Sequence, residues 1–245
     1  MINIYYDFHI HSCLSPCGDM DMTPNNLVNM AKLLGHDAIA LTDHNTARNC
    51  PAAAAVAEQL DMLFVPGMEL CTSEEAHIVC LFPDVDSALA FSDEVEQRTP
   101  FFRNDPDKLG KQVIMDEDDE IIGEIEGSLL MASDISIDEV PALIESYGGV
   151  AYPAHIDRDS YSVIASLGVF PEFSGYTACE ITGAGDVAAL TADNPCIGLM
   201  PKILSSDAHY LENMIERSAS VELPERTAKC LIEAIKGNIE AVWRR

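Results

Sequence analysis

Short apolar runs alternate with helical segments over the first 80 residues. Residues 3–10 mix aromatic and β-branched side chains and predict a strand, and three later apolar runs have the same character. Thr23-Pro24 is typical of a helix start, and Pro51 opens an alanine-rich helix. The strands are expected at residues 3–10, 38–42, 62–65 and 77–82, and the helices at 25–34 and 51–60. Polar residues gather where these strands end, which is the pattern of an α/β barrel with its site at one face.

The alternation breaks between about residues 84 and 132. A helix is expected at 87–96, followed by a loop with two prolines. Two short apolar runs, 112–115 and 121–123, then flank the acidic residues 116–120, which predicts a β-hairpin. The acidic run has the composition of a cation store, but a solvated turn that keeps the hairpin soluble is the favoured interpretation. We treat the whole stretch as an insertion that covers the site or makes an oligomer contact.

The second half of the chain returns to strands and helices. A helix at 138–147 ends at Gly148-Gly149, and strands are expected at 150–153, 178–181 and 202–205. An apolar alternation at 219–223 precedes a closing amphipathic helix at 224–235. No internal repeat or linker stands out, so the prediction is a single domain over 1–245 with the insertion at 84–132.

The composition is that of a soluble globular protein, with 245 residues and 48% hydrophobic content. No apolar run reaches the roughly 18 residues that span a bilayer. The first residues lack the basic region of a signal peptide, so we expect a cytoplasmic protein without a membrane partner. The eight cysteines have no regular spacing and are expected as reduced thiols. No pattern indicates an oligomeric state.

The formal net charge of −27, with only 14 Lys and Arg, argues against a large nucleic-acid surface. We therefore expect no long nucleic acid as partner. A small anionic substrate remains compatible with this charge if the site itself is positive.

Six of the seven histidines have a setting suited to metal binding. His9 and His11, two residues apart on an extended segment, project to the same side and can converge on one ion. The others follow a carboxylate or stand at a strand boundary, namely His44, His77, His155 and His209. His36, after Gly35 at a helix end, is expected to be structural, capping the helix or interacting with its dipole.

These residues fall in a series of short motifs. In chain order they are Asp7-x-His9-x-His11-Ser12, Thr42-Asp43-His44-Asn45, Pro66-Gly67-x-Glu69, His77-Ile78-x-x-Leu81, Pro153-Ala154-His155 and Ser206-Asp207-x-His209. The series resembles the PHP (polymerase and histidinol phosphatase) family. That resemblance implies an irregular (βα)7 barrel, similar to a TIM barrel, that holds two or three divalent metal ions.

The resemblance also implies a division of the ligands among three ions. The first ion would be held by His9, His11, Glu69 and Asp207, the second by Glu69 as a bridge with His77 and His155, and the third by His44, His209 and an acid of the first loop. That acid normally follows the second histidine by about five residues, whereas here the nearest candidate is Asp19. Asp21 and Cys17 are the substitutes.

Imidazole and carboxylate ligands suit zinc, manganese and iron, and a bridging carboxylate brings two ions to the spacing of two-metal hydrolysis. Three divalent ions against the carboxylates of Asp19, Glu69 and Asp207 leave a charge of about +3, which would attract a phosphate. We expect a metal-bridging hydroxide to attack phosphorus in line. Glu69, Asp207, His155 and Asp43 are the residues expected to take part in this step.

Asp7 and Asp43 are expected behind the ligands, where Asp7 would orient the His9/His11 pair and Asp43 would orient His44. Proton donation to the leaving group is the alternative for Asp43. Arg158 and, more weakly, Arg48 are candidate phosphate clamps, with an ordinary surface ion pair as the alternative for each.

The leading functional hypothesis is a phosphatase that acts on a small phosphorylated metabolite, such as histidinol phosphate or a nucleotide. An exonuclease on short oligonucleotides would use the same metals but needs a groove lined with basic or aromatic side chains. A non-catalytic metal-binding or regulatory module is a third hypothesis. C–N bond hydrolysis is a fourth, but such sites commonly recruit a lysine at a strand end, and Lys202 begins its strand.

Overall fold

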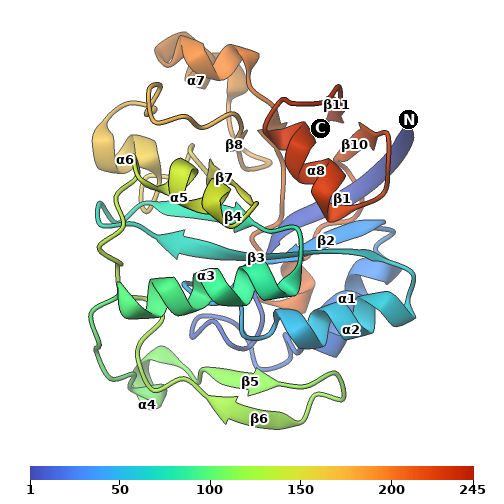
Figure 1. Ribbon diagram of the computed structural model, residues 1–245, viewed down its shortest axis with the longest axis vertical. Coiled ribbons are helices and arrows are strands. Elements are labelled where there is room, and N and C mark those ends of the chain that lie inside the picture. Colours follow the sequence, from blue (N-terminus) through green and yellow to red (C-terminus); the bar gives the residue numbers. More distant parts are fainter.

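The computed structural model describes all residues from 1 to 245 and shows an α/β fold built on a curled sheet (Figure 1). The sheet has seven strands in the order β11-β10-β1-β2-β3-β4-β7, and two further pairs of strands, β5-β6 and β8-β9, lie apart from it. The strands are β1 (Ile2–Ile10), β2 (Ala38–Leu41), β3 (Leu63–Cys71), β4 (His77–Leu81), β5 (Val113–Met115), β6 (Ile121–Glu124), β7 (Val150–Pro153), β8 (Cys179–Glu180), β9 (Lys202–Ile203), β10 (Ser220–Leu223) and β11 (Val242–Arg244).

Eight α-helices connect and cover these strands. They are α1 (Pro24–Leu33), α2 (Cys50–Gln59), α3 (Val85–Gln97), α4 (Pro106–Leu109), α5 (Val140–Ser146), α6 (Val163–Leu167), α7 (Val187–Asp193) and α8 (Ala228–Ile235), with two 3₁₀ turns at Pro195–Leu199 and Leu211–Asn213. Helices α1, α2 and α3 lie together on one side of the sheet (Figure 1). No helix of the chain combines the length and the apolar content that crossing a bilayer requires.

The strands form an incomplete, irregular barrel. β1, β2 and β3 are parallel, whereas β4 runs antiparallel to both of its neighbours, β3 and β7. The short β8-β9 pair stands between β7 and β1. The Ile156 N–H donates to the Glu180 carbonyl at 2.9 Å, and on the other side the Asp207 N–H donates to the His9 carbonyl at 2.9 Å and the His11 N–H to the Ala208 carbonyl at 3.0 Å. The predicted α/β barrel-like fold is thus confirmed.

Two apolar cores lie on opposite faces of the strands. The inner core contains Tyr6, Phe8 and Tyr152, and it is covered at one end by the apolar face of α8. The outer core joins the other strand face to α1, α2, α3 and α5. Because both faces of the central strands are buried, those strands have nearly continuous apolar sequences, which made them easy to predict.

Several elements differ from the expected ones. β3 continues to Cys71 and does not end at residue 65, because Gly67 lets its backbone approach β4, where an added Cβ would meet the Cys80 carbonyl oxygen at 2.7 Å. α8 begins at Ala228, since Thr227 is its N-cap and accepts a hydrogen bond from Cys230 N–H. α6, α7 and β11 were not expected.

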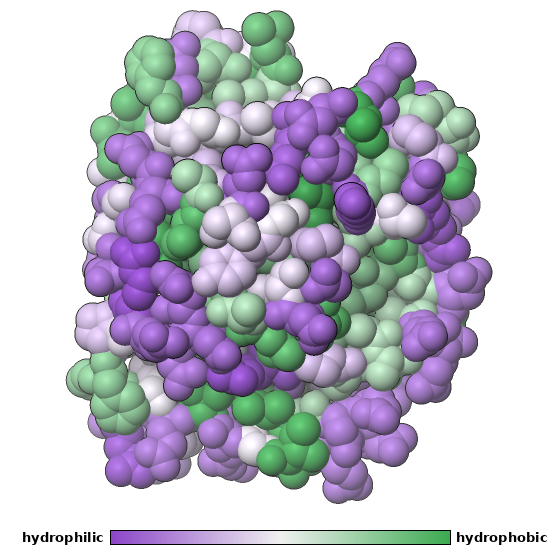
Figure 2. All heavy atoms as spheres, in the orientation of Figure 1, coloured by the Kyte–Doolittle hydropathy of each residue, from purple (hydrophilic) through white to green (hydrophobic).

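The segment after α3 contains the predicted hairpin, β5-β6, which lies at the edge of the molecule beyond α2 and α3 (Figure 1). Figure 2 shows apolar residues exposed near the lower edge of this face. Ile121 and Ile122 of β6 are exposed apolar residues. The acidic turn is not only solvated, because the Asp119 carboxylate accepts hydrogen bonds from Thr23 and Asn25 at the start of α1. α3 itself buries Phe91 and Val95 in the outer core. The division into one domain with an insertion at 84–132 stays a prediction.

Candidate metal centre

Polar side chains from six strands meet at one end of the barrel. His9 and His11 come from the end of β1, His44 follows β2, Glu69 lies in β3, His77 begins β4, His155 follows β7, and Asp207 and His209 follow β9. His77 belongs with the others although it begins its strand. β4 is antiparallel, and it pairs His77 with Cys71 at the end of β3, so its first residue lies at the edge where the parallel strands end.

The donor atoms of this cluster lie close together. His9 Nε2 is 3.2 Å from Glu69 Oε1 and 3.2 Å from Asp207 Oδ1. His44 Nδ1 is 2.9 Å from Glu69 Oε2, and the ring centroids of His11 and His209 are 4.1 Å apart. Six imidazoles and two carboxylates therefore share one small volume.

Three groups within the cluster have all their donor atoms within 4.8 Å of one another. They are His9, His11, Glu69 and Asp207; His44, Glu69 and His77; and His11, His44 and His209. Glu69 belongs to two groups, which is the arrangement of a carboxylate shared between two ions. His155 adds to it through Nε2, 3.1 Å from Glu69 Oε1.

Three buried polar atoms in the cluster, Glu69 Oε2, His155 Nδ1 and Asp207 Oδ1, make no hydrogen bond of good geometry, although imidazole nitrogens lie within 3.2 Å of the two carboxylate oxygens. Leaving such atoms unpaired costs free energy, so buried polar atoms are nearly always satisfied in native proteins. All three atoms are good ligands for a divalent cation. The residues present therefore fit the metal ions that the motifs imply.

The electrostatics favour positive charge between the carboxylates. Burial opposes protonation of His9, but Glu180, Asp207 and Glu69 outweigh it and raise the pKa of His9 well above its usual range. Burial likewise opposes protonation of His11, yet hydrogen bonds to Asp207 and Glu69 raise its pKa to about 9. Burial raises the pKa of Glu69, but His77 and His9 outweigh this and hold it well below the usual range. A metal cation would exploit the same preference.

Two residues behind the ligands hold the imidazoles of the β1 pair. Both carboxylate oxygens of Glu180 are 3.0 Å from His9 Nδ1, and Glu180 also accepts the His155 N–H at 3.1 Å. Ser15 Oγ is 2.9 Å from His11 Nδ1. Such partners fix the orientation of a ligating imidazole and leave its other nitrogen free for a metal.

Asp43 does not have either role that the sequence suggested. Its carboxylate accepts hydrogen bonds from the Ser12 N–H, the Ser12 hydroxyl and the Ser15 hydroxyl at 2.6–2.7 Å, and it makes no hydrogen bond or ion pair with an imidazole. It is 1% exposed and does not line the cavity, so a leaving group does not reach it. Asp43 acts through Ser15, which bonds both His11 Nδ1 and the His44 N–H.

Asp7 also differs from expectation. Its carboxylate accepts hydrogen bonds from the backbone N–H groups of Ser206 at 3.1 Å and His9 at 3.4 Å, and not from the imidazoles. It therefore ties the loop before Asp207 to β1. His36 lies outside the cluster. Its Nε2 is 2.9 Å from the Ile215 carbonyl oxygen, and its backbone N–H donates to the Ala31 carbonyl in the last turns of α1 at 3.0 Å, as expected for a structural residue.

Asp19 is not part of any of the three ligand groups. Its carboxylate accepts the Asp21 N–H at 2.8 Å, and only its own backbone N–H reaches the cluster residues, donating to the His209 carbonyl. The group that corresponds to the third ion thus consists of three histidines. Cys17 lines the cavity beside it.

A cavity of about 280 Å³ opens onto these ligands. Its walls include Arg158, Tyr161, Leu129 and Leu130 in addition to cluster residues. Arg158 Nη1 is 2.5 Å from Asp207 Oδ2 and its side chain is 45% exposed, so the guanidinium lies between a ligand carboxylate and solvent. This is a suitable place for a phosphate clamp.

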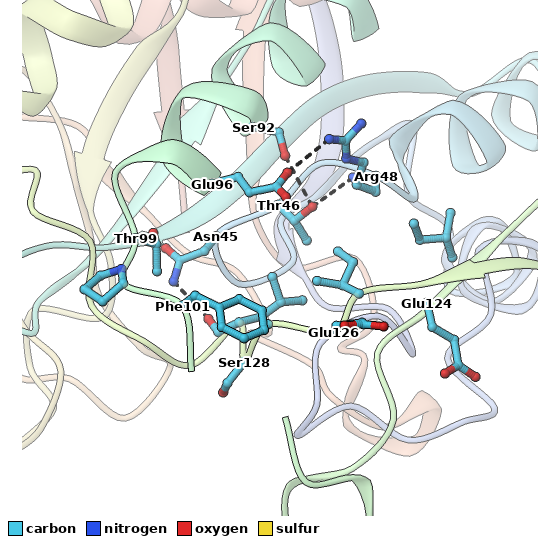
Figure 3. Close-up of a pocket in the computed structure, with 15 residues that line it drawn as sticks. Asn45, Thr46, Arg48, Ser92, Glu96, Thr99, Phe101, Glu124, Glu126 and Ser128 are labelled. Carbon is cyan, nitrogen blue, oxygen red and sulfur yellow. Dashed lines mark hydrogen bonds and ion pairs between the residues drawn. The ribbon is translucent and has the colours of Figure 1, made fainter. Parts of the chain in front are cut away.

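Arg48 lies elsewhere. It lines a different cavity of about 490 Å³, between α3 and the segment 124–129, where it points toward Glu96 (Figure 3). Its Nη2 is bound to Asp93 at 2.7 Å and to Glu96 at 3.3 Å. Two carboxylates therefore occupy the guanidinium outside the metal cavity, and a role for Arg48 in substrate binding is not supported.

Three residues of the ligand motifs have backbones in the left-handed region: Asn45 (φ 53°), His155 (φ 27°) and Asp207 (φ 51°). Such conformations are costly for residues other than glycine and persist where the surroundings impose them, often at functional sites. Asn45 is held through its amide, which donates to the carbonyls of Leu129 and Met131 and accepts the Cys71 N–H at 2.8–2.9 Å. The loop after β2 is thereby fixed to both β3 and the cavity wall.

Sequence reasoning missed Glu180, Ser15 and Tyr161. Glu180 had one visible signal, since it is a lone carboxylate in the apolar run 178–181. Ser15 and Tyr161 lie in irregular loops, and no spacing rule relates them to the histidines.

Comparison with known proteins agrees with this geometry. Residues 7–147 match the PHP domain family, which is more than half of the chain. The chain belongs to the PHP domain family. The PHP motifs at His9/His11, His44, Glu69 and His77 all lie within the matched residues.

Among curated proteins, the PHP chain is 42% identical over 65 residues to the PolC-type DNA polymerase III of Staphylococcus haemolyticus. The match covers 26% of this chain and 4% of the polymerase, so the chain spans a very small part of its curated relatives.

Solved structures share the fold over most of the chain. The lesion-specific endonuclease Q of Pyrococcus furiosus superposes with a TM-score of 0.71 at 17% identity, covering 99% of this chain and 58% of that one. A protein of Bifidobacterium adolescentis assigned as a metal-dependent phosphoesterase has a TM-score of 0.58 at 17% identity, covering 83% and 87%. An amidohydrolase of Chromobacterium violaceum has a TM-score of 0.60 at 18% identity, covering 91% and 93%.

Proposed function

We propose that this PHP protein is a metal-dependent hydrolase of phosphate esters. The observation that carries the proposal is the set of six imidazoles and two carboxylates, with unpartnered oxygens on Glu69 and Asp207, at the floor of an open cavity. Two or three divalent ions of zinc, manganese or iron suit this donor set. Family membership and the phosphoesterase fold of the Bifidobacterium protein support the same reaction class.

Ions held there would act as Lewis acids on the phosphoryl oxygens and lower the pKa of a bound water. The protein groups prepare the site for that chemistry. Glu69 and Asp207 are ionised, because the neighbouring histidines keep the pKa of each carboxyl below its usual range despite burial. Glu180 and Ser15 hold the rings of His9 and His11, and Arg158 is placed to bind a phosphate oxygen once its contact with Asp207 is exchanged for one with substrate.

The size of the cavity favours a small substrate or the end of a larger one. At about 280 Å³ it is slightly smaller than typical ligand pockets of roughly 300–1,000 Å³. A phosphomonoester of a small metabolite, such as histidinol phosphate or a nucleotide, is our first candidate.

Hydrolysis of nucleic acid is the second candidate, and the comparisons favour it more than the sequence did. Endonuclease Q, of similar fold, has been crystallised with a 27-mer duplex that carries an abasic lesion at its active site. The PolC-type relative is a DNA polymerase. These similarities count against excluding long nucleic acid as a partner, although the net charge of −27 leaves few cations for phosphate contacts.

C–N bond hydrolysis is not favoured, although one structural neighbour is described as an amidohydrolase. The lysine that such sites recruit is missing from this cluster. Lys202 points elsewhere, with its Nζ donating to the Gly198 carbonyl at 3.0 Å.

The test is an assay of the purified protein with manganese or zinc against phosphomonoesters, a five-nucleotide DNA and a duplex with an abasic lesion. We expect turnover of at least one monoester and loss of about 1,000-fold or more in a His9→Ala variant, because a ligand to the first ion is gone. Faster cleavage of the oligonucleotides than of a mononucleotide would favour the nuclease candidate. No turnover above the His9→Ala background on any substrate would refute the proposal.

A further inference from the structure

The wall of the metal cavity opposite the barrel contains an aromatic residue that the phosphoesterase chemistry does not need. Tyr161 lines the cavity together with Arg158 and Leu130. Its ring stacks on the imidazole of His77, with centroids 4.8 Å apart and an interplanar angle of 24°. Tyr161 is nevertheless 53% exposed, so His77 covers only part of the ring.

The backbone of Tyr161 is held in an unfavourable conformation. Its φ is 53°, in the left-handed region where a bulky side chain is a genuine outlier. The Tyr161 carbonyl accepts the His77 N–H at 2.8 Å, so the backbone and the ring are both attached to His77. A strained residue that is mostly solvent-exposed contributes little to the core, and its position therefore calls for an explanation in function.

The turn that carries Tyr161 also carries Arg158 and is fixed at both ends. The Arg158 N–H bonds the His155 carbonyl at 2.9 Å, and the Ser162 hydroxyl bonds the Arg158 carbonyl at 2.7 Å while capping α6. Asp157 anchors the turn to the end of β8 through the Thr182 N–H and hydroxyl. The guanidinium and the aromatic ring are thus presented together at the mouth of the cavity.

We propose that Tyr161 is a specificity-determining residue that stacks a planar heteroaromatic ring of the substrate while Arg158 binds its phosphate. The inference rests on the proposed phosphoesterase function. Leu129 and Leu130 on the cavity wall supply the apolar surroundings in which such stacking is effective. A nucleobase and an imidazole are both planar heteroaromatic rings that can stack on Tyr161. Sugar phosphates and glycerol phosphate have no such ring.

The experiment compares four phosphomonoesters: a nucleoside monophosphate, histidinol phosphate, ribose 5-phosphate and glycerol phosphate. With the metal-loaded protein we expect kcat/KM for one ring-bearing ester to exceed that for the ring-free esters by about 10-fold or more, as base–aromatic stacking provides. The preferred ester then shows whether the stacked ring is a nucleobase or an imidazole.

Two variants make the test specific. Tyr161→Asn removes the ring with a residue that tolerates a positive φ, and it should raise KM for the preferred ester by about 10-fold more than KM for the ring-free esters. Tyr161→Phe keeps the ring and should behave as wild type. Metal content and melting temperature of each variant show that the site and the fold are intact.

Similar kcat/KM values for all four esters in wild type, or an equal loss on all four in Tyr161→Asn, would refute the role of Tyr161 and leave the phosphoesterase function standing. Absence of turnover with every ester would refute the phosphomonoesterase function itself.

Discussion

Glu180 is a buried carboxylate that orients the His9 imidazole without itself belonging to a candidate ligand group. It is 2% exposed and contacts both the His9 imidazole and the His155 backbone, so it couples the ligands from β1 and β7. Because its negative charge lies beside His9, it should also increase the affinity of the group that contains His9 for a metal cation.

We therefore expect Glu180→Gln to weaken zinc binding by about 10-fold or more, because the amide can still accept a hydrogen bond from His9 but carries no charge. The measurement is competition with a chromophoric chelator. Glu172→Gln, a change of the same chemistry at an exposed position, is the matched control. An affinity equal to wild type would show that Glu180 has no part in the centre.

The cysteines differ sharply in environment. Burial raises the pKa of the Cys13, Cys50 and Cys179 thiols to about 12, whereas Cys17 is exposed at the metal cavity. Since the thiolate is the reactive form, native protein at pH 8 should be alkylated at Cys17 long before any of these three buried thiols. Mass spectrometry of tryptic peptides after a short iodoacetamide pulse measures this. Early labelling of Cys50 would contradict the structure.

At the scale of elements, the strands and the larger helices could be predicted because their apolar residues are continuous or periodic. The strand ends then placed His9, His11, His44 and His155 at one edge of the barrel. Glu180 and Tyr161 could not be predicted, because their contacts join segments far apart in the sequence and depend on loop conformations that have no periodic pattern. The position of Arg48 could not be predicted either. Its spacing of four residues from His44 does not determine whether its side chain points toward the metal cavity or toward Asp93 and Glu96.

The contact between the hairpin tip and α1 is an element-scale feature that can be tested. Thr23 caps α1 by accepting the Asn26 N–H and donates its own hydroxyl to Asp119. Thr23→Val should therefore lower the free energy of unfolding by about 1–2 kcal/mol, or the melting temperature by about 2–6 °C. Thr23→Ser, which keeps the hydroxyl, is the control and should stay within about 1 °C of wild type by the same conversion. Equal melting temperatures for both variants would contradict the role of the cap.

At the scale of the molecule, the free energy of unfolding of the metal-free protein depends on pH, because imidazoles of the cluster bind protons in the folded state. Hydrogen bonds to carboxylates raise the pKa of His11 to about 9 against burial, from about 6.5 in an unfolded chain. Burial and His11 lower the pKa of His44, but Cys17 and Glu69 outweigh them and raise it to about 9. A raised folded pKa stabilises the fold fully below pH 6.5, and this contribution is lost as pH rises through 9.

Metal-stripped protein should consequently lose about 10 °C or more in melting temperature between pH 6.5 and 9. With zinc the trend should reverse, because metal and protons compete for the same nitrogens and metal binds better as pH rises. Differential scanning fluorimetry with EDTA or zinc across this range measures both trends. Stability of the stripped protein that increases toward pH 9 would show that these imidazoles are not protonated in the fold.

The candidate ligands extend along the sequence from His9 in β1 to His209, which follows β9. During translation, His9 is synthesised long before Asp207, so the group that contains both residues cannot form until both have left the ribosome. A nascent chain stopped at residue 200 would contain five of the six imidazoles and Glu69, but it would lack Asp207 and His209. An ion bound by the group of His9, His11, Glu69 and Asp207 would therefore mark a chain that extends at least to residue 207.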